Sequence, residues 1–105
     1  MSNKNIEPRN NKKKAHGLWK VYHPNGQLKY KGNYVNGYQD GYWEVYYSNG
    51  KLWHKGNYVN GDRHGYWEHY FTDGEVYYKG YYDMGKEVDY EVQIDTPSNE
   101  MFAIY

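Results

Sequence analysis

A 24-residue unit recurs three times in this 105-residue chain and constrains its fold more than any other feature. Each copy opens with a glycine, carries a tryptophan at its third position and has a tyrosine at its sixth. The opening residues are Gly17, Gly41 and Gly65, and the tryptophans are Trp19, Trp43 and Trp67. Self-similarity at a fixed short period predicts a repeat array, in which each unit is stabilised mainly by its neighbours.

The residues within one copy predict a β-hairpin. The run YWEVYY is rich in the aromatic and β-branched types that suit a pleated strand, and the run KLWHKGNYV follows it. Between them lies an Asn-Gly or Asp-Gly pair, a strong hairpin signal because these residues tolerate positive φ. We therefore expect an all-β, single-layer antiparallel meander with flanking caps and three hairpin repeats, over residues 17–40, 41–64 and 65–88.

Alternation along each strand gives the expected sheet two different faces. In the second copy, the side that carries Trp43, Val45, Leu52 and Tyr58 is expected to be the more buried. A glycine recurs inside the second strand of each copy, at Gly32, Gly56 and Gly80. Because glycine normally weakens a strand, its recurrence predicts a bend, or a ring lying flat over the backbone, for which the repeated tryptophans are the candidates.

Composition excludes most catalytic chemistry. Aromatic residues make up 21% of the chain and include 16 tyrosines, so rings must form the core. There is no cysteine, and the five histidines lack the spacing of a closed metal site. No phosphate-binding loop or nucleophile elbow is present, and a single sheet offers no deep pocket. We therefore expect no enzyme activity, no metal and no cofactor.

The ends of the chain differ in charge from its neutral middle. Residues 1–15 carry five basic side chains and one acidic one, and residues 87–105 carry five acidic side chains and no basic one. We expect residues 1–15 to be a flexible basic arm. We expect residues 87–105 to hold a capping strand and an apolar tail that covers the last repeat or docks on a partner or a second copy. With no apolar run long enough for a membrane span and no signal peptide, the chain is expected to be cytoplasmic.

The repeated pattern resembles the MORN repeat, and in particular its bacterial variant, over residues 16–86. The shared motif is G-x-W-x-x-Y-x-x-N-G followed by x-x-G-x-Y-x-N-G, as in Gly41, Trp43, Tyr46, Asn49, Gly50, Gly56, Tyr58, Asn60 and Gly61. The third copy departs from it with Asp73 and Met84 in place of asparagine. The resemblance implies an elongated, twisted β-meander with a non-catalytic role, and relatives of this kind include the antitoxin half of an immunity pair.

Exposed aromatic rings beside charges favour the binding of another protein, since tyrosine and tryptophan are frequent at interface hot spots. We expect an inhibitor, immunity (antitoxin-like) or adaptor role in a bacterium, a phage or a virus. The candidate protein-binding residues are Tyr42, Glu44, Tyr46, Trp53, Tyr66, Glu68, Tyr70 and Tyr77.

Three alternatives remain open at this point. A column of lysines together with the basic arm could bind nucleic acid or acidic lipid, through Lys31, Lys55, Lys79, Lys12, Lys13 and Lys14. The chain could be a structural component of a larger assembly. It could also associate with itself through the open sheet edges or the C-terminal tail.

Overall fold

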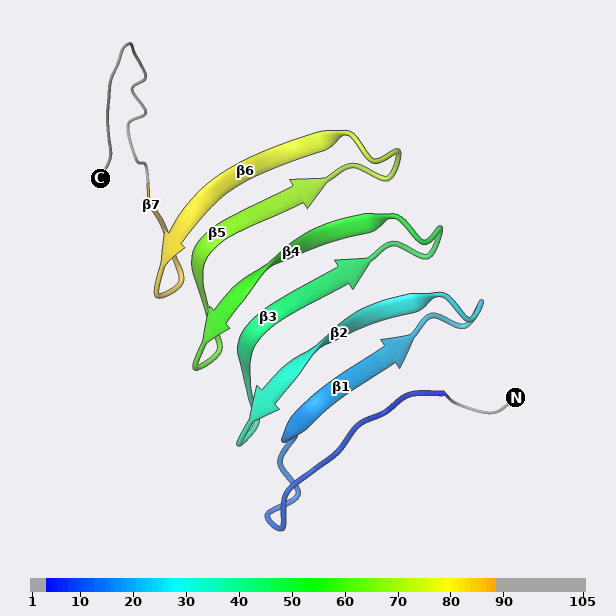
Figure 1. Cartoon of the computed structure of the whole chain (residues 1–105), viewed down its shortest axis with the longest axis vertical. Coiled ribbons are helices and arrows are strands. Elements are labelled where there is room, and N and C mark those ends of the chain that lie inside the picture. Colours follow the sequence, from blue (N-terminus) through cyan, green and yellow to red (C-terminus); the bar gives the residue numbers. More distant parts are fainter. Residues whose placement is uncertain (1–3, 89–105) are drawn as a thin grey trace.

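Seven strands follow one another in chain order across one antiparallel sheet (Figure 1). The computed structural model describes residues 4–88. The strands are β1 (Gly17–Tyr22), β2 (Leu28–Val35), β3 (Tyr38–Tyr46), β4 (Leu52–Val59), β5 (Asp62–Tyr70), β6 (Val76–Asp83) and β7 (Lys86–Val88). The meander of three hairpins predicted from the repeat is therefore confirmed.

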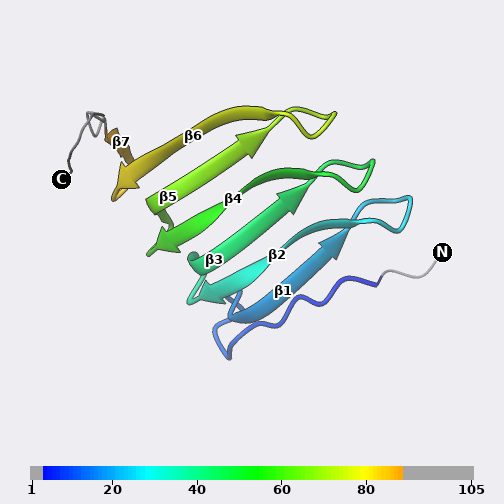
Figure 2. The same cartoon turned by 45° about the horizontal axis from the view of Figure 1, so that its top comes forward.

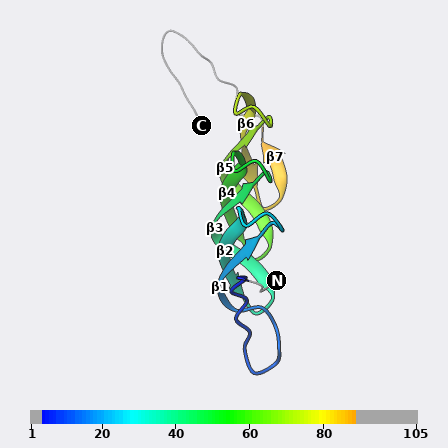
Figure 3. The same ribbon diagram turned by 90° about the vertical axis from the view of Figure 1, so that its right-hand side faces the viewer.

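Among residues 4–88 the sheet is a single layer, and no other described element packs on either face. Its strands curve together along their length (Figure 2), and the edge-on view shows one thin, twisted ribbon (Figure 3). The shortest extent is 15 Å against a longest extent of 55 Å. Among the described residues, the buried hydrophobic side chains are Trp19, Val21, Trp43 and Trp67. Burial is thus concentrated on one ring in each repeat.

Trp43 and Trp67 each lie over a glycine of the preceding repeat. A Cβ atom on Gly32 would overlap the indole of Trp43, and one on Gly56 would overlap that of Trp67. The indole Nε1 of Trp43 donates a hydrogen bond to the Asn33 carbonyl oxygen at 3.0 Å. The recurrent mid-strand glycine is explained, because only a residue without a side chain lets the ring lie against the strand.

The third glycine of this series has a different cover. No tryptophan follows Trp67 in the chain, and the hydroxyl end of Tyr78 lies over Gly80 instead. At the other end of the array, Trp19 donates its Nε1 hydrogen to the Pro8 carbonyl oxygen at 2.8 Å. The first tryptophan therefore packs on the N-terminal segment, which takes the place of a preceding repeat.

Within the described residues 4–15, part of the segment expected to be a flexible basic arm lies beside the edge strand β1. Ile6 and Lys20 exchange two backbone hydrogen bonds, of 2.8 and 2.9 Å. Tyr22 donates its backbone N–H to the side chain of Asn5 at 2.8 Å. The segment covers part of an edge that would otherwise expose unpaired backbone groups. At the other edge, β7 pairs with the end of β6, and the rest of the expected C-terminal cap and tail lies outside the described residues.

Asparagine side chains join the hairpin turns of successive repeats. Asn25 donates its Nδ2 hydrogen to the Ser48 carbonyl oxygen, and Asn49 does the same to Thr72. Each of these asparagines also accepts a hydrogen bond within its own turn. Asp73 retains the accepting contact but has no amide hydrogen to donate. This departure falls in the turn between β5 and β6, which among residues 4–88 is the last of the three turns that carry these asparagine or aspartate positions.

The turns between repeats require positive φ at two successive residues. Asn36 and Gly37 have φ of 49° and 89°, and the next two such turns have nearly the same values. These are the angles of a type I′ turn, in which asparagine followed by glycine is favoured. In the third turn the first position is Met84, with φ of 49°. A long side chain in the left-handed region is strained.

Substituting Met84→Asn is therefore expected to stabilise the protein by about 0.5–1 kcal/mol, the order of the left-handed penalty that asparagine relieves. The change should appear as a higher midpoint in urea unfolding. The matched reverse change, Asn60→Met in the preceding turn, should lower the midpoint. A Met84→Asn protein with an unchanged or lower midpoint would contradict strain at this turn.

Candidate binding surface

A tyrosine–glutamate–tyrosine cluster lies on β3 and is joined by two side-chain hydrogen bonds. The Tyr42 hydroxyl donates to Glu44 Oε2 at 2.9 Å, and the Tyr46 hydroxyl donates to Glu44 Oε1 at 2.7 Å. The three residues alternate along one strand and so project from the same face. The Tyr42 side chain is 48% exposed, whereas Trp43 on the opposite face is 2% exposed. The prediction that the tryptophan side is the more buried is confirmed.

The same cluster recurs on β5. Tyr70 donates its hydroxyl hydrogen to Glu68 Oε1, and Tyr66 is a second hydrogen-bond donor to this carboxylate. Tyr66 also packs beside Tyr81 of β6, with ring centroids 5.3 Å apart. The two clusters define what we call the tyrosine–glutamate face, made of Tyr42, Glu44, Tyr46, Tyr66, Glu68 and Tyr70.

The lysine column lies on this same face, between the glutamates. Backbone register places Lys31 opposite Glu44, and Lys55 opposite both Glu44 and Glu68. The shortest ion-pair distances, from lysine Nζ to glutamate oxygen, are 3.6 Å for Lys31–Glu44 and 3.6 Å for Lys55–Glu68. Lys79 approaches Glu68 at 4.0 Å. Two sets of residues expected to serve different partners thus form one surface in which the charges alternate.

Electrostatics keep this surface in one protonation state at neutral pH. Burial alone would raise the pKa of Glu44, but hydrogen bonds from Tyr46 and Tyr42 and the charge of Lys31 lower it overall. The hydrogen bond from Tyr70 is the main cause of the lowered pKa of Glu68. Burial and the hydrogen bond to Glu44 raise the pKa of Tyr46 to about 12. The carboxylates remain ionised acceptors and the phenols remain donors.

Two expected members lie apart from the clusters. Trp53 stacks on Tyr47 at a centroid distance of 5.0 Å, and Tyr77 packs against Phe71 at 5.1 Å. These aromatic pairs lie by the hairpin turns, where the register shifts between Val45 and Tyr46 and again one repeat later. A bulge places one extra residue in a strand and interrupts the alternation on which the sequence prediction depended.

Because of the same bulge, the predicted position of Leu52 is wrong. This residue was expected on the buried face with Trp43, but it pairs with Tyr46 across the bulge. Paired residues project from the same face of an antiparallel sheet, so Leu52 belongs with the tyrosine–glutamate face.

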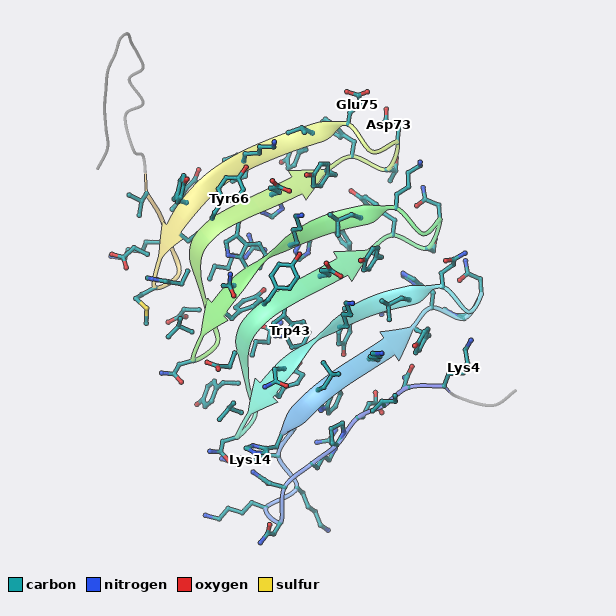
Figure 4. All side chains as sticks on the ribbon, in the orientation of Figure 1. Lys4, Lys14, Trp43, Tyr66, Asp73 and Glu75 are labelled. Atoms are coloured by element: carbon teal, nitrogen blue, oxygen red, sulfur yellow. The ribbon has the colours of Figure 1, made fainter. Side chains whose placement is uncertain are left out.

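The N-terminal lysines do not join the column. Lys12 and Lys14 donate their backbone N–H groups to the side chain of Asn10 in a tight loop, in which Lys13 has φ of 65°. Lys14 lies beside Gly37, at the turn between the first two repeats. Figure 4 shows Lys14 at the opposite end of the sheet from Asp73 and Glu75. The basic arm and the lysine column are separate features.

The first repeat does not carry the cluster. Leu18, Lys20 and Tyr22 occupy the positions of the two tyrosines and the glutamate between them. The face is therefore asymmetric along the array. Tyr81 is a contact residue that sequence reasoning missed, although its spacing of two from Lys79 could have placed it on this side.

Within residues 4–88 no group of three or more histidine or acidic side chains is arranged to hold a metal ion. In the same part of the chain, none of the elements is a helix long and apolar enough to cross a membrane.

The family model described as MORN repeat variant matches residues 15–36, 39–60 and 63–84. The three matches begin at the same 24-residue interval as the repeat. A comparison with curated proteins gives no significant match.

Proposed function

We propose that this chain, which belongs to the MORN repeat variant family, binds another protein through its tyrosine–glutamate face. MORN repeats are generally non-catalytic binding modules. The observation that carries the proposal is the duplicated cluster, in which an exposed tyrosine ring is held by a hydrogen bond to a glutamate on the same strand.

The clusters suit recognition because their side chains are fixed before a partner arrives. Tyr42 and Tyr66 each offer a large amphipathic ring, and their hydrogen bonds to Glu44 and Glu68 restrict the rings in the free protein. A tyrosine loses little conformational entropy on binding, and prior ordering reduces that cost further. No other layer of the described chain covers this face.

The arrangement gives less support to a polyanion-binding surface. Lys31, Lys55 and Lys79 each approach a glutamate carboxylate, so much of their charge is balanced locally. Affinity for nucleic acid depends on cations that are available to replace counterions. A protein partner with its own alternating charges and aromatic groups fits the face better than a phosphate backbone. We further propose that the bound protein is inhibited or held by the module, as an immunity protein or an adaptor would do.

The proposal is tested by placing a photo-crosslinking phenylalanine analogue at Tyr42 or at Tyr66 and irradiating the protein in extract of the host cell. We expect both positions to crosslink to the same protein, and the crosslink to form also when the extract is irradiated at high salt. Tyr38 provides the matched control position, because it is 59% exposed but is the first residue of β3, outside the two clusters. Equal crosslinking from Tyr38, or products limited to nucleic acid, would contradict binding of a protein through this face.

A further inference from the structure

The joint between the second and third repeats differs chemically from the joint between the first and second. Across β4 and β5, His54 lies opposite His69, whereas the equivalent pair across β2 and β3 is Tyr30 opposite Val45. The two imidazole rings are stacked, with centroids 5.2 Å apart and planes 27° from parallel. Two titratable bases therefore face each other where the first joint has a phenol and an aliphatic side chain.

A permanent cation stands beside this histidine pair. The Nη1 atom of Arg63 lies 3.2 Å from His69 Nε2, and the guanidinium group lies 4.5 Å from the centre of the Trp67 ring. Arg63 occupies the repeat position of Gln39, so the first joint lacks this charge as well. A proton gained by either imidazole would place a second positive charge next to the guanidinium group.

The strands beyond β5 offset the positive charge beside the histidine pair only in part. From β6, Tyr77 and Tyr78 contribute rings that pack against His69, at centroid distances of 6.4 and 5.6 Å. From β7, Glu87 favours a charge on His69, but it also accepts the Tyr78 hydroxyl hydrogen. On the β4 side, His54 packs against Trp53 and Trp67. Aromatic surfaces thus make up most of the surroundings.

His54 is the more strongly affected of the pair. Its Nδ1 atom is buried without a hydrogen-bond partner among the described residues. Burial first, and then the charges of Arg63 and His69, lower the pKa of His54 to about 4. Burial and Arg63 also lower the pKa of His69, with Glu87 acting in the opposite direction. The folded joint therefore holds two neutral imidazoles at neutral pH.

We propose that the His54–His69 pair is an acid-sensitive joint, at which the third repeat separates from the second when the imidazoles become protonated. One tyrosine–glutamate–tyrosine cluster lies on β3 and the other on β5, so opening between β4 and β5 divides the binding face. That consequence rests on the proposed function, whereas the opening itself does not.

The sign of the pH dependence follows from proton uptake. In the open joint an exposed imidazole has its ordinary pKa of about 6.5. Since the pKa of each histidine is lower in the closed joint, opening takes up protons. The closed joint is therefore most stable above about pH 6.5, and it loses stability as the pH falls toward the pKa of the closed state. With a folded pKa of about 4 for His54, opening at about pH 5 should be favoured at least about tenfold over its value at neutral pH.

Hydrogen exchange on the isolated full-length chain tests this joint directly. Amide protection is measured at neutral pH and at about pH 5, corrected for the intrinsic rate, and compared between β5–β6 and β1–β2. The pKa values of Glu44 and Glu68 are lowered, so these carboxylates stay ionised over this range and do not produce the same response. The matched variant is His54→Tyr with His69→Val, which reproduces the Tyr30–Val45 pair of the first joint.

In the wild-type protein we expect β5–β6 to lose protection at least about tenfold at the lower pH while β1–β2 keeps it, and we expect the double variant to lose this response. An equal loss across the whole sheet, or an acid response retained by the double variant, would overturn the proposal. If the double variant does not fold, Arg63→Gln is used in its place. Removing the cation should weaken the acid-induced loss of protection in β5–β6, and an unchanged loss would contradict the proposal. Crosslinking at Tyr66 tests the proposed function separately at neutral pH.

Discussion

Replacing Trp67 with alanine is expected to destabilise the protein by about 3–5 kcal/mol, the usual cost of removing a large aromatic side chain from a packed core. The side chain is fully buried, at 0% exposure, and its Nε1 hydrogen is donated to the Asn57 carbonyl oxygen at 3.0 Å. Tyr58 packs edge-on against it at 5.0 Å. Because the described strands form one layer, no second described layer can collapse into the space, so the loss should approach the upper end of the range. Urea unfolding followed by circular dichroism measures it.

The matched control for this substitution is Trp53→Ala. The substitution removes the same number of atoms, but Trp53 is 44% exposed and its ring stacks on Tyr47 near a hairpin turn. We expect it to cost about 1 kcal/mol or less, in line with partly exposed positions. A similar cost at both tryptophans would show that burial of one ring per repeat is not what stabilises the array.

Gly56→Ala is expected to destabilise by about 3 kcal/mol, at the upper end of the range for overpacking. The added Cβ atom would overlap the indole of Trp67, and neither partner can move away. The glycine lies within the central strand β4, and the ring is held by the Asn57 carbonyl oxygen. A lower urea midpoint, together with altered tryptophan fluorescence, is the expected observation.

Gly80→Ala tests the same substitution without an indole above it. At this position the Cβ atom would meet the hydroxyl end of Tyr78, which can rotate away at the cost of its hydrogen bond to Glu87. Alanine also suits a strand better than glycine does, so the net effect should be within about 1 kcal/mol. If Gly80→Ala were as damaging as Gly56→Ala, the glycine would be required for a reason other than the ring.

The parts of the fold that depend on periodicity could be predicted from the sequence. The 24-residue interval fixed the number of hairpins, and alternation around Trp43 identified the more buried face. The recurrent glycine predicted a ring over the backbone, which Trp43 and Trp67 supply. These features follow from strand geometry alone and need no knowledge of side-chain conformation.

Features that depend on local irregularity could not be predicted in this way. The bulge at Trp53 of β4, opposite Val45 and Tyr46, moves Leu52 to the other face, and no residue type in the sequence marks it. The pairing of Lys31 with Glu44 depends on register across a turn between repeats. The polar composition of residues 1–15 predicts a flexible arm, whereas the hydrogen bonds that the described part of this segment makes with β1 come from backbone groups and Asn5. Backbone hydrogen bonding leaves little trace in composition.

The most direct test of a protein-binding tyrosine–glutamate face uses the partner that crosslinking identifies. The amount of this partner that is pulled down at high salt is compared between the wild-type protein and the double variant Tyr42→Ser/Tyr66→Ser. The two substitutions remove exposed rings and leave the buried tryptophans in place. We expect the unfolding free energy of the variant to stay within about 1 kcal/mol of the wild-type value. We expect the amount of partner that it pulls down to fall at least about tenfold. Unchanged recovery by the folded variant would contradict binding through this face.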